Sequence, residues 1–407
     1  MKVSLIGCPF QSTYGEYIES LRSGLERRLG APVQWVSSNC CCGDPFQDAR
    51  GFQVNDSDYF EMREKIAGYS LVGYSHDPTK RFLRAGIRSL SNARRAKRFA
   101  DLASGADVIH FQQILGAYGS DVVFRFLRQR SNAARVITVH ELDDEQTDFP
   151  ERNRTYNLAD AVVVHDSLLK NKLASLGVAE DLVHVVRQGT DLEEGESFAR
   201  DGVVFYAGHH FNEGKGIEIL LSAYRSLKDR YSGPAPRLRI HGHYGPTPPT
   251  QFLEKARQLN LADDVEWLNE LSSSEIVGLY RRSQVCVLPY SGGFAGLPVG
   301  VAAANRLPII ATRTAGIPDH IGDLGIWIGG DDARELADRI EKVLQDVAMS
   351  EDYGARLRAH AVEHLGWDAV ARDTLDVYQS ARERMTRRQK LTVAAGHPSA
   401  AETAKRA

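Results

Sequence analysis

Residues 203–217 read Val-Val-Phe-Tyr-Ala-Gly-His-His-Phe-Asn-Glu-Gly-Lys-Gly-Ile. The first five residues are apolar and suit a buried strand, the glycines suit a turn, and residues 216–231 have the spacing of an amphipathic helix. A lysine at the start of a helix lies near free backbone N–H groups that favour anions. This strand–turn–helix unit is therefore suited to hold a negatively charged group.

Similar units precede and follow this one, because short apolar runs alternate with helical stretches along most of the chain. Upstream we expect strands at 2–8, 33–36, 108–111, 136–139 and 161–164, and a helix over 14–29. Downstream we expect strands at 203–207, 237–241, 265–268, 285–289 and 308–311, and helices over 216–231, 249–260, 273–282, 297–304 and 333–346. The sequence thus predicts an α/β protein of two Rossmann-like parallel-sheet domains that face each other across a cleft.

The predicted boundary between the domains follows from composition. Residues 189–201 are rich in glycine and acidic residues and suit a linker. We therefore place an N-terminal domain at 1–192 and a second domain at 202–360. Residues 386–407 lack apolar periodicity and are rich in Ala, Lys, Arg and Thr, so we expect a disordered tail there.

Overall composition limits the classes of partner. The 407 residues carry a net charge of −3, which gives no global electrostatic argument for nucleic acid. No run approaches the roughly 20 apolar residues that span a bilayer, and the first residues lack the features of a signal peptide. Of the five cysteines, Cys8 and Cys286 lie in apolar runs, whereas Cys40, Cys41 and Cys42 are adjacent and lack metal-ligand spacing. A reduced cytoplasmic protein without a bound metal is expected.

Five stretches of the second half, in order and at matching distances, resemble the donor domain of the retaining glycosyltransferases of family 4. They are Val203–His210 with Gly214–Ile217, Val265–Leu268, Leu279–Ser291, Gly296–Pro298, and Leu307–Thr312 with Ala315–Asp319. Residues 107–110, 136–140, 159–164 and 185–191 resemble the acceptor-side domain more loosely, and residues 361–385 resemble the helix that braces that domain. The resemblance implies a GT-B fold that transfers a sugar, with retention, from a nucleoside-diphosphate sugar to a hydroxyl acceptor, without cofactor or metal.

The resemblance also assigns roles to particular residues. On the donor side Lys215 would hold the diphosphate, and His209 stands where the family has an arginine. Catalytic roles fall to Lys215 and to His140, which matches the family's active-site histidine beside the donor sugar. The remaining donor-binding candidates are Gly15, Trp267, Leu268, Gly293, Phe294, Ala295, Gly296, Leu297 and Val301, and the acceptor or cleft candidates are His110 and Glu141.

One departure from the family pattern leaves the function open. The family carries two glutamates eight positions apart, and those places hold Gly293 and Val301 here. Each lost charged hydrogen bond costs about 1.5–3 kcal/mol. Glu270, Glu275 and Asp319 are nearby acids that could substitute. Three hypotheses follow: an ordinary transferase, a transferase with an atypical donor, and a GT-B module that binds a glycan, lipid or protein without turnover.

A basic segment with no acidic residue before Asp101 lies outside the resemblance. It contains Arg81, Arg84, Arg88, Arg94 and Arg95, with apolar residues at roughly helical spacing. A basic amphipathic helix suits an anionic membrane surface on the inner face, and the acceptor would then be lipid-linked. A solvated helix face neutralised by acids elsewhere explains the charges equally well. Nucleic acid is disfavoured because few aromatic residues interleave the cations.

Overall fold

The computed structural model describes residues 1–7, 12–37, 105–112, 131–140, 142, 155–193, 200–208, 213–232, 235–242, 250–269, 271–293, 295–314, 316–330 and 332–394. The chain divides into two compact units, which are described separately. Unit 1 comprises Met1–His165, Leu169–Val186 and Val370–Ala407, and unit 2 comprises Asp166–Leu168 and Arg187–Ala369. None of the helices in the described ranges combines the length and apolar character needed to cross a membrane.

Unit 1 is built on a sheet of six parallel strands in the order β2-β1-β3-β4-β5-β6. The strands are β1 (Val3–Gly7), β2 (Gln34–Ser37), β3 (Val108–Gln112), β4 (Ala134–Thr138), β5 (Ala161–Val164) and β6 (Val183–Val185). Among the described residues of this part of the chain, the helical elements are α1 (Ser12–Leu29), α6 (Ser167–Ser175), the 3-10 turn η3 (Glu180–Leu182) and most of α14 (Trp367–Ala394). Strands β3, β4 and β5 are buried along their whole length, as near-continuous apolar runs in a covered parallel sheet predict.

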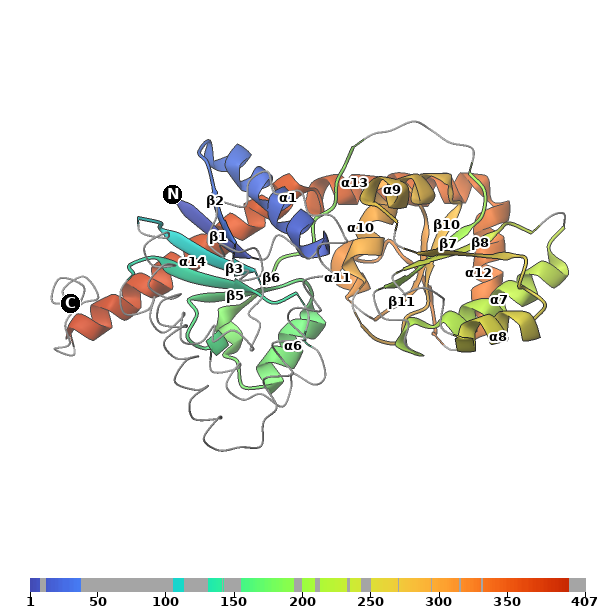
Figure 1. The fold of residues 1–407 in the computed structure, drawn as a ribbon, viewed down its shortest axis with the longest axis horizontal. Helices are drawn as coiled ribbons and strands as arrows, with labels where there is room; N and C mark the ends of the chain where they lie inside the picture. Colours follow the sequence, from blue (N-terminus) through green and yellow to red (C-terminus); the bar gives the residue numbers. More distant parts are fainter. Residues whose placement is uncertain are drawn as a thin grey trace, which may run out of the picture. The chain divides into compact units, whose positions relative to one another are not determined.

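Unit 2 repeats this architecture with the strand order β12-β11-β10-β7-β8-β9. Its strands are β7 (Val203–Gly208), β8 (Leu238–Gly242), β9 (Val265–Asn269), β10 (Val285–Leu288), β11 (Ile309–Thr312) and β12 (Ile326–Ile328). Its helices are η4 (Glu213–Lys215), α7 (Ile217–Arg230), α8 (Thr250–Gln258), α9 (Ser273–Arg282), α10 (Gly296–Ala304), α11 (Ile317–Ile321), α12 (Ala333–Gln345) and α13 (Val347–His364). Figure 1 shows α7 and α12 together beside this sheet, and its core is one continuous apolar cluster.

Most predicted strands and helices are confirmed to within one or two residues at each end. The sequence-based assignment omitted the short strands β6 and β12 and the helices α6, α11 and α13. It also placed the chain's last helix at 361–385, whereas α13 ends at His364 and α14 starts at Trp367 and continues to Ala394. Helix α1 begins at Ser12 rather than at residue 14, so Gly15 lies inside the helix and not in a turn before it.

The chain passes from unit 1 to unit 2 earlier than the composition suggested. Residues 187–192 belong to unit 2, although we had expected the N-terminal domain to extend to residue 192. Their backbone partners explain this. The Thr190 N–H donates to the Leu365 carbonyl, the Gln188 N–H donates to His320 Nε2, and the Trp367 ring packs directly on Gly189.

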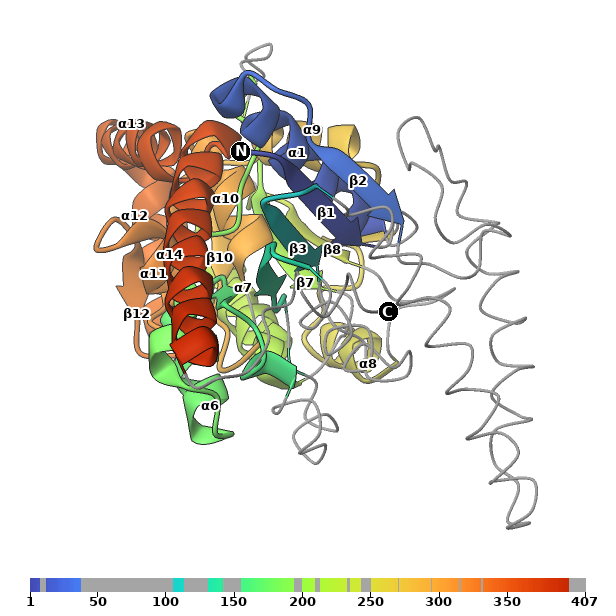
Figure 2. The same ribbon diagram turned by 90° about the vertical axis from the view of Figure 1, so that its left-hand side faces the viewer.

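Helix α14 packs along the unit 1 sheet: Figure 1 shows it beside β3 and β5, and Figure 2 shows it from the side. The Tyr378 hydroxyl lies 2.7 Å from His110 Nδ1 of β3. Further along the helix, Arg384 binds the Asp181 carboxylate and Arg388 binds Asp160, which is fully buried. These bonds explain why residues 386–394 are helical despite their lack of apolar periodicity, which had predicted a disordered tail.

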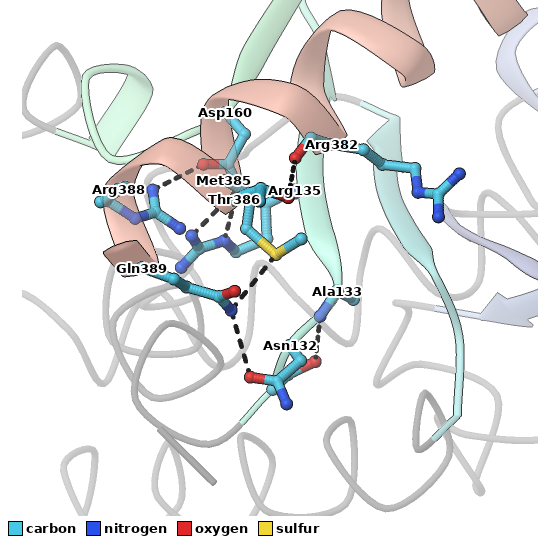
Figure 3. Close-up of polar contacts among 10 residues, drawn as sticks. Asn132, Ala133, Arg135, Asp160, Arg382, Met385, Thr386, Arg388 and Gln389 are labelled. Atoms are coloured by element: carbon cyan, nitrogen blue, oxygen red, sulfur yellow. Dashed lines mark hydrogen bonds and ion pairs between the residues drawn. The ribbon is translucent and has the colours of Figure 1, made fainter. Parts of the chain in front are cut away.

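The buried carboxylate of Asp160 organises the end of this helix (Figure 3). Its Oδ2 accepts hydrogen bonds from the backbone N–H, Nε and NH2 of Arg135, at 3.0–3.1 Å. Its Oδ1 accepts from Arg388, whose side chain is 29% exposed, whereas the Arg135 and Asp160 side chains are 1% and 0% exposed. Removing one partner of a buried ion pair leaves an uncompensated charge and costs about 3–5 kcal/mol.

We therefore expect Asp160→Asn to lower the free energy of unfolding by about 3–5 kcal/mol, because it leaves the Arg135 charge buried. Arg388→Met is the control and should cost only about 1 kcal/mol, since its side chain is partly solvated and Arg135 stays paired. Urea unfolding measures both variants, and hydrogen exchange in β4 and β5 locates the loss in unit 1. Equal stability of Asp160→Asn and the native protein would contradict this account.

Candidate functional site

Unit 2 carries its first candidate residue where the strand order reverses. Strand β7 has β8 on one side and β10 on the other, so the connections leave β7 and β10 in opposite directions. Parallel sheets bind ligands beyond the carboxyl ends of the strands at such a point. Lys215, in η4 after β7, and Tyr290, two residues after β10, come from these ends. Lys215 is 7% exposed, and its Nζ lies 4.1 Å from the centroid of the buried Tyr290 ring.

Backbone hydrogen bonds hold this part of unit 2 together. The N–H groups of Ser291 and Gly292 both donate to the Gly214 carbonyl, at 2.9 and 3.2 Å. Gly216 follows Lys215 with φ +69°, and a Cβ atom there would lie 2.1 Å from the Pro289 carbonyl oxygen. Only glycine fits so close an approach, so Gly216 fixes the segment that carries the lysine against the segment that carries Tyr290.

The place of the first family glutamate faces this lysine. Gly293 has φ +85°, and a Cβ atom built on it would meet Lys215 Nζ at 3.3 Å and Cε at 3.7 Å. A side chain at position 293 would therefore touch the ammonium group. Because residue 293 is a glycine, it places no side chain against Lys215.

Burial also changes the acidity of the lysine. Desolvation lowers the pKa of Lys215 to about 8, because taking a cation out of water favours its neutral form. An anion bound next to the ammonium group would restore the charged form. A buried lysine stacked on an aromatic ring, next to a glycine loop, is therefore suited to binding a phosphate or carboxylate group.

The other donor-side candidates have different environments. Val301 is 8% exposed and belongs to the hydrophobic core of unit 2, so the place of the second family glutamate is a packing position. Ala295 and Gly296 are buried at the start of α10, and Leu297 is half-buried. Trp267 and Leu268 are half-buried on the edge strand β9, which β8 separates from β7.

Two of the three acids proposed as substitutes have structural partners. Glu275 forms a capping box with Ser272 at the start of α9, and the Asp319 carboxylate accepts a hydrogen bond from the Ser167 hydroxyl. Glu270, His209, Phe294, Glu141 and the basic residues Arg81, Arg84, Arg88, Arg94 and Arg95 lie outside the described residues. The membrane-contact hypothesis therefore stays a prediction.

Unit 1 carries a second cluster, of three buried histidines at neighbouring strands. His140 follows β4 and is 8% exposed, whereas His165 follows β5 and is 1% exposed. His140 Nδ1 lies 2.9 Å from His165 Nε2, and His140 Nε2 lies 3.1 Å from the Gln112 side-chain amide. Tyr17 packs against both rings, edge-on to His140. Burial, together with the neighbouring histidines, holds the pKa of His140 well below 6.5.

His110, an acceptor or cleft candidate, is held inside the sheet of unit 1. It lies in the middle of β3, where its Nδ1 is 2.7 Å from the Tyr378 hydroxyl and its Nε2 is 2.7 Å from the Thr138 hydroxyl. Burial lowers its pKa to about 3. Both ring nitrogens are thus engaged by the protein itself, and His110 connects α14 to the sheet.

Sequence reasoning missed Gln112, Tyr290 and His165. His165 follows the apolar run of β5 as His140 follows that of β4, so its position after a strand was the available signal. Within the described ranges, no group of three or more His, Cys, Asp or Glu residues is arranged to hold a metal ion.

Comparisons with known proteins identify the family. Residues 15–194 match the family model "Glycosyltransferase Family 4", and residues 201–346 match "Glycosyl transferases group 1". The chain belongs to the family 4 glycosyltransferases. Its two units of six parallel strands give the chain the two-domain α/β architecture of the GT-B type.

The sequence identity between this chain and individual relatives is low. The D-inositol 3-phosphate glycosyltransferase of Corynebacterium diphtheriae is 28% identical over 173 residues, which cover 41% of this chain and 40% of that protein. The chain spans between 38% and 58% of the length of the curated relatives that it matches. A Rickettsia africae glycosyltransferase has a TM-score of 0.65 at 15% identity over 93% of this chain and 98% of its own. Anabaena Alr3699/HepE, crystallised in complex with UDP, has a TM-score of 0.62 at 13% identity over 93% of this chain and 100% of its own.

The close approach at Gly216 predicts a large effect of one methyl group. Gly216→Ala should lower the free energy of unfolding by about 2 kcal/mol or more, because the new Cβ meets the Pro289 carbonyl and φ is positive. Gly278→Ala is the matched control: this glycine lies within α9 with open space around it, so alanine should stabilise by about 0.5–1 kcal/mol. Urea unfolding measures both, and a neutral Gly216→Ala would refute the constraint.

Proposed function

We propose that the protein transfers a sugar from a nucleoside-diphosphate sugar to a hydroxyl group of an acceptor. The observation that carries this proposal is the buried Lys215 ammonium group at the reversal of strand order, beside the Gly293 backbone. In the reaction the bond between the anomeric carbon and the diphosphate oxygen breaks, and its electron pair leaves with the diphosphate. The anomeric carbon bonds to the acceptor oxygen, whose proton passes to the departing diphosphate or to water.

The described residues supply separate parts of this chemistry. Lys215 would neutralise the negative charge that develops on the diphosphate. Stabilising such developing charge is usually the largest single contribution to catalysis. Because a lysine supplies the positive charge, we propose that no metal cofactor is needed. For His140 we propose a hydrogen bond to a hydroxyl group of a sugar substrate. We also propose retention of configuration at the anomeric carbon, as the family resemblance implies.

A second candidate is a GT-B module that binds without turnover, or a transferase for an atypical donor. It is favoured by one observation: Gly293 offers no carboxylate beside Lys215, and Val301 is part of the hydrophobic core. Incubating the protein with each nucleotide sugar that binds, and then measuring the nucleoside diphosphate released, distinguishes a transferase from a module that only binds. Binding without release in the presence of glycan and lipid-linked acceptors would favour the module, and the anomeric proton coupling of any product tests retention.

Thermal-shift titration with UDP, GDP, ADP and dTDP, with and without EDTA, tests the donor site. A ligand that binds only the folded state should add about 2.7 kcal/mol of stability at a hundredfold excess over Kd. We expect one nucleotide to give this shift equally with EDTA, and Lys215→Met to abolish it. Lys342→Met, on the exposed side of α12, is the matched control and should keep the shift. No shift with any nucleotide at millimolar concentration would refute the proposal.

The acidity of Lys215 predicts how nucleotide affinity depends on pH. Its pKa is lowered to about 8, so its positive charge is lost as the pH rises through 8, and the affinity should fall by up to about tenfold per pH unit above that value. Lys215→Arg should remove this dependence, because arginine stays protonated. Isothermal titration with the selected nucleotide between pH 7 and 9.5 measures both proteins. Parallel pH profiles would show that Lys215 does not carry the charge that binds the nucleotide.

A further inference from the structure

A continuous chain of side-chain hydrogen bonds crosses the sheet of unit 1 and ends at a backbone carbonyl. Its members are Tyr378, His110, Gln112, His140 and His165, and its end is the Val186 oxygen, 3.0 Å from His165 Nδ1. A carbonyl oxygen can only accept a hydrogen bond. This fixed end determines the direction of the bonds that precede it.

The direction follows atom by atom from Val186. His165 Nδ1 must carry the proton that it donates to the Val186 carbonyl, so a neutral His165 has a lone pair on Nε2. That lone pair accepts from His140 Nδ1, 2.9 Å away. A neutral His140 then has its own lone pair on Nε2. Burial favours the neutral form of this ring, whose pKa is lowered chiefly by desolvation and further by the two neighbouring histidines.

The Gln112 amide completes the chain with the same direction. In the structure the Gln112 side-chain oxygen lies 3.1 Å from His140 Nε2, but two lone pairs cannot bond, so the amide has to be turned over to place its NH2 group at that position. Its oxygen then faces His110 Nε2, at the position 3.2 Å away, and accepts from it. His110 Nε2 also lies 2.7 Å from the Thr138 hydroxyl, while the Tyr378 hydroxyl donates to His110 Nδ1. Each bond along the chain from Tyr378 to Val186 now has one donor and one acceptor when all three histidines are neutral, and the His110 Nε2 proton is shared between Gln112 and Thr138.

From this chain we infer that His165 is a positioning residue, which through the Val186 carbonyl holds His140 as the tautomer protonated on Nδ1. His140 Nε2 therefore offers a lone pair. A ligand group that takes the place of the Gln112 amide at this lone pair must be a hydrogen-bond donor, such as a sugar hydroxyl. It cannot be a phosphate oxygen. The inference about the ligand rests on the proposed function, whereas the tautomer itself does not.

Long-range proton–nitrogen correlation NMR on the full chain with nitrogen-15-labelled histidine tests the tautomer directly. His140→Gln assigns the signals of residue 140. We expect a proton-bearing Nδ1 and a lone-pair Nε2 on His140 near pH 7.5. A proton on Nε2, whether in the other tautomer or in the cationic ring, would overturn the inference without any reference to turnover.

Two substitutions of His165 test its control over the tautomer. His165→Phe keeps a ring but removes the acceptor, and it should give a mixture of both tautomers of His140. His165→Gln places an amide oxygen near the position of Nε2 and should restore the native pattern. An unchanged native pattern in His165→Phe, with native-like circular dichroism, would also overturn the inference.

Kinetics separate this inference from the proposed function. If turnover is found, His165→Phe should lower kcat by roughly threefold to tenfold, the effect of one lost neutral hydrogen bond, with little change in KM. His165→Gln should restore kcat. If no nucleotide binds, the proposed function fails and the NMR result still decides the tautomer. An equal loss of kcat in both variants would show that His165 acts only through packing.

Discussion

In each sheet the strand order reverses beside the first strand of the unit, β1 or β7, and the connections leave the two central strands in opposite directions. This topological constraint leaves the carboxyl ends of the strands uncovered at the reversal. Lys215 follows β7 and Tyr290 follows β10, so these two residues, which are far apart in the sequence, lie in contact at the reversal. In unit 1, β3 at the reversal carries Gln112, and the next two strands lead to His140 and His165. Both candidate clusters thus depend on the same feature of the fold.

The two units keep their buried polar groups by different means. In unit 2 a cation is placed on the Tyr290 ring, and part of the cost of its burial is seen in its lowered pKa. In unit 1 burial lowers the pKa values of His110 and His140 and so favours their neutral forms, and each histidine ring is hydrogen-bonded by its neighbours. Buried polar groups that are fully satisfied fix one arrangement, because every alternative leaves a donor or acceptor unmade. The lysine in unit 2 is thus placed to bind an anion, whereas the hydrogen-bonded histidines in unit 1 determine which ring nitrogen of His140 carries the proton.

The sequence predicted the fold well because the evidence was local. Apolar runs such as 161–164 and 285–288 and the amphipathic spacing of 333–345 are visible over a few residues. Strands β6 and β12 were not predicted, because three residues are too few to show a periodic pattern. The end of α14 was not predicted, because ion pairs with Asp160 and Asp181 stabilise it rather than an apolar face. The pairing of His110 with Tyr378, 268 positions away, and the burial of Val301 in the core depend on tertiary contacts that no local pattern encodes.

The position of His165 gives its hydrogen bond a further consequence. His165 and Val186 are each the last residue of a unit 1 segment, where the chain passes to Asp166 and to Arg187 of unit 2. The bond between them therefore joins the two segments of unit 1 at the places where they end. Because the Val186 carbonyl sets the direction of every bond back to His140, the backbone at these two crossings has to keep its native position for His140 to keep its tautomer. A substitution that shifts either crossing should thus act on His140 without touching it, which a change in the ring nitrogen signals of His140 would reveal.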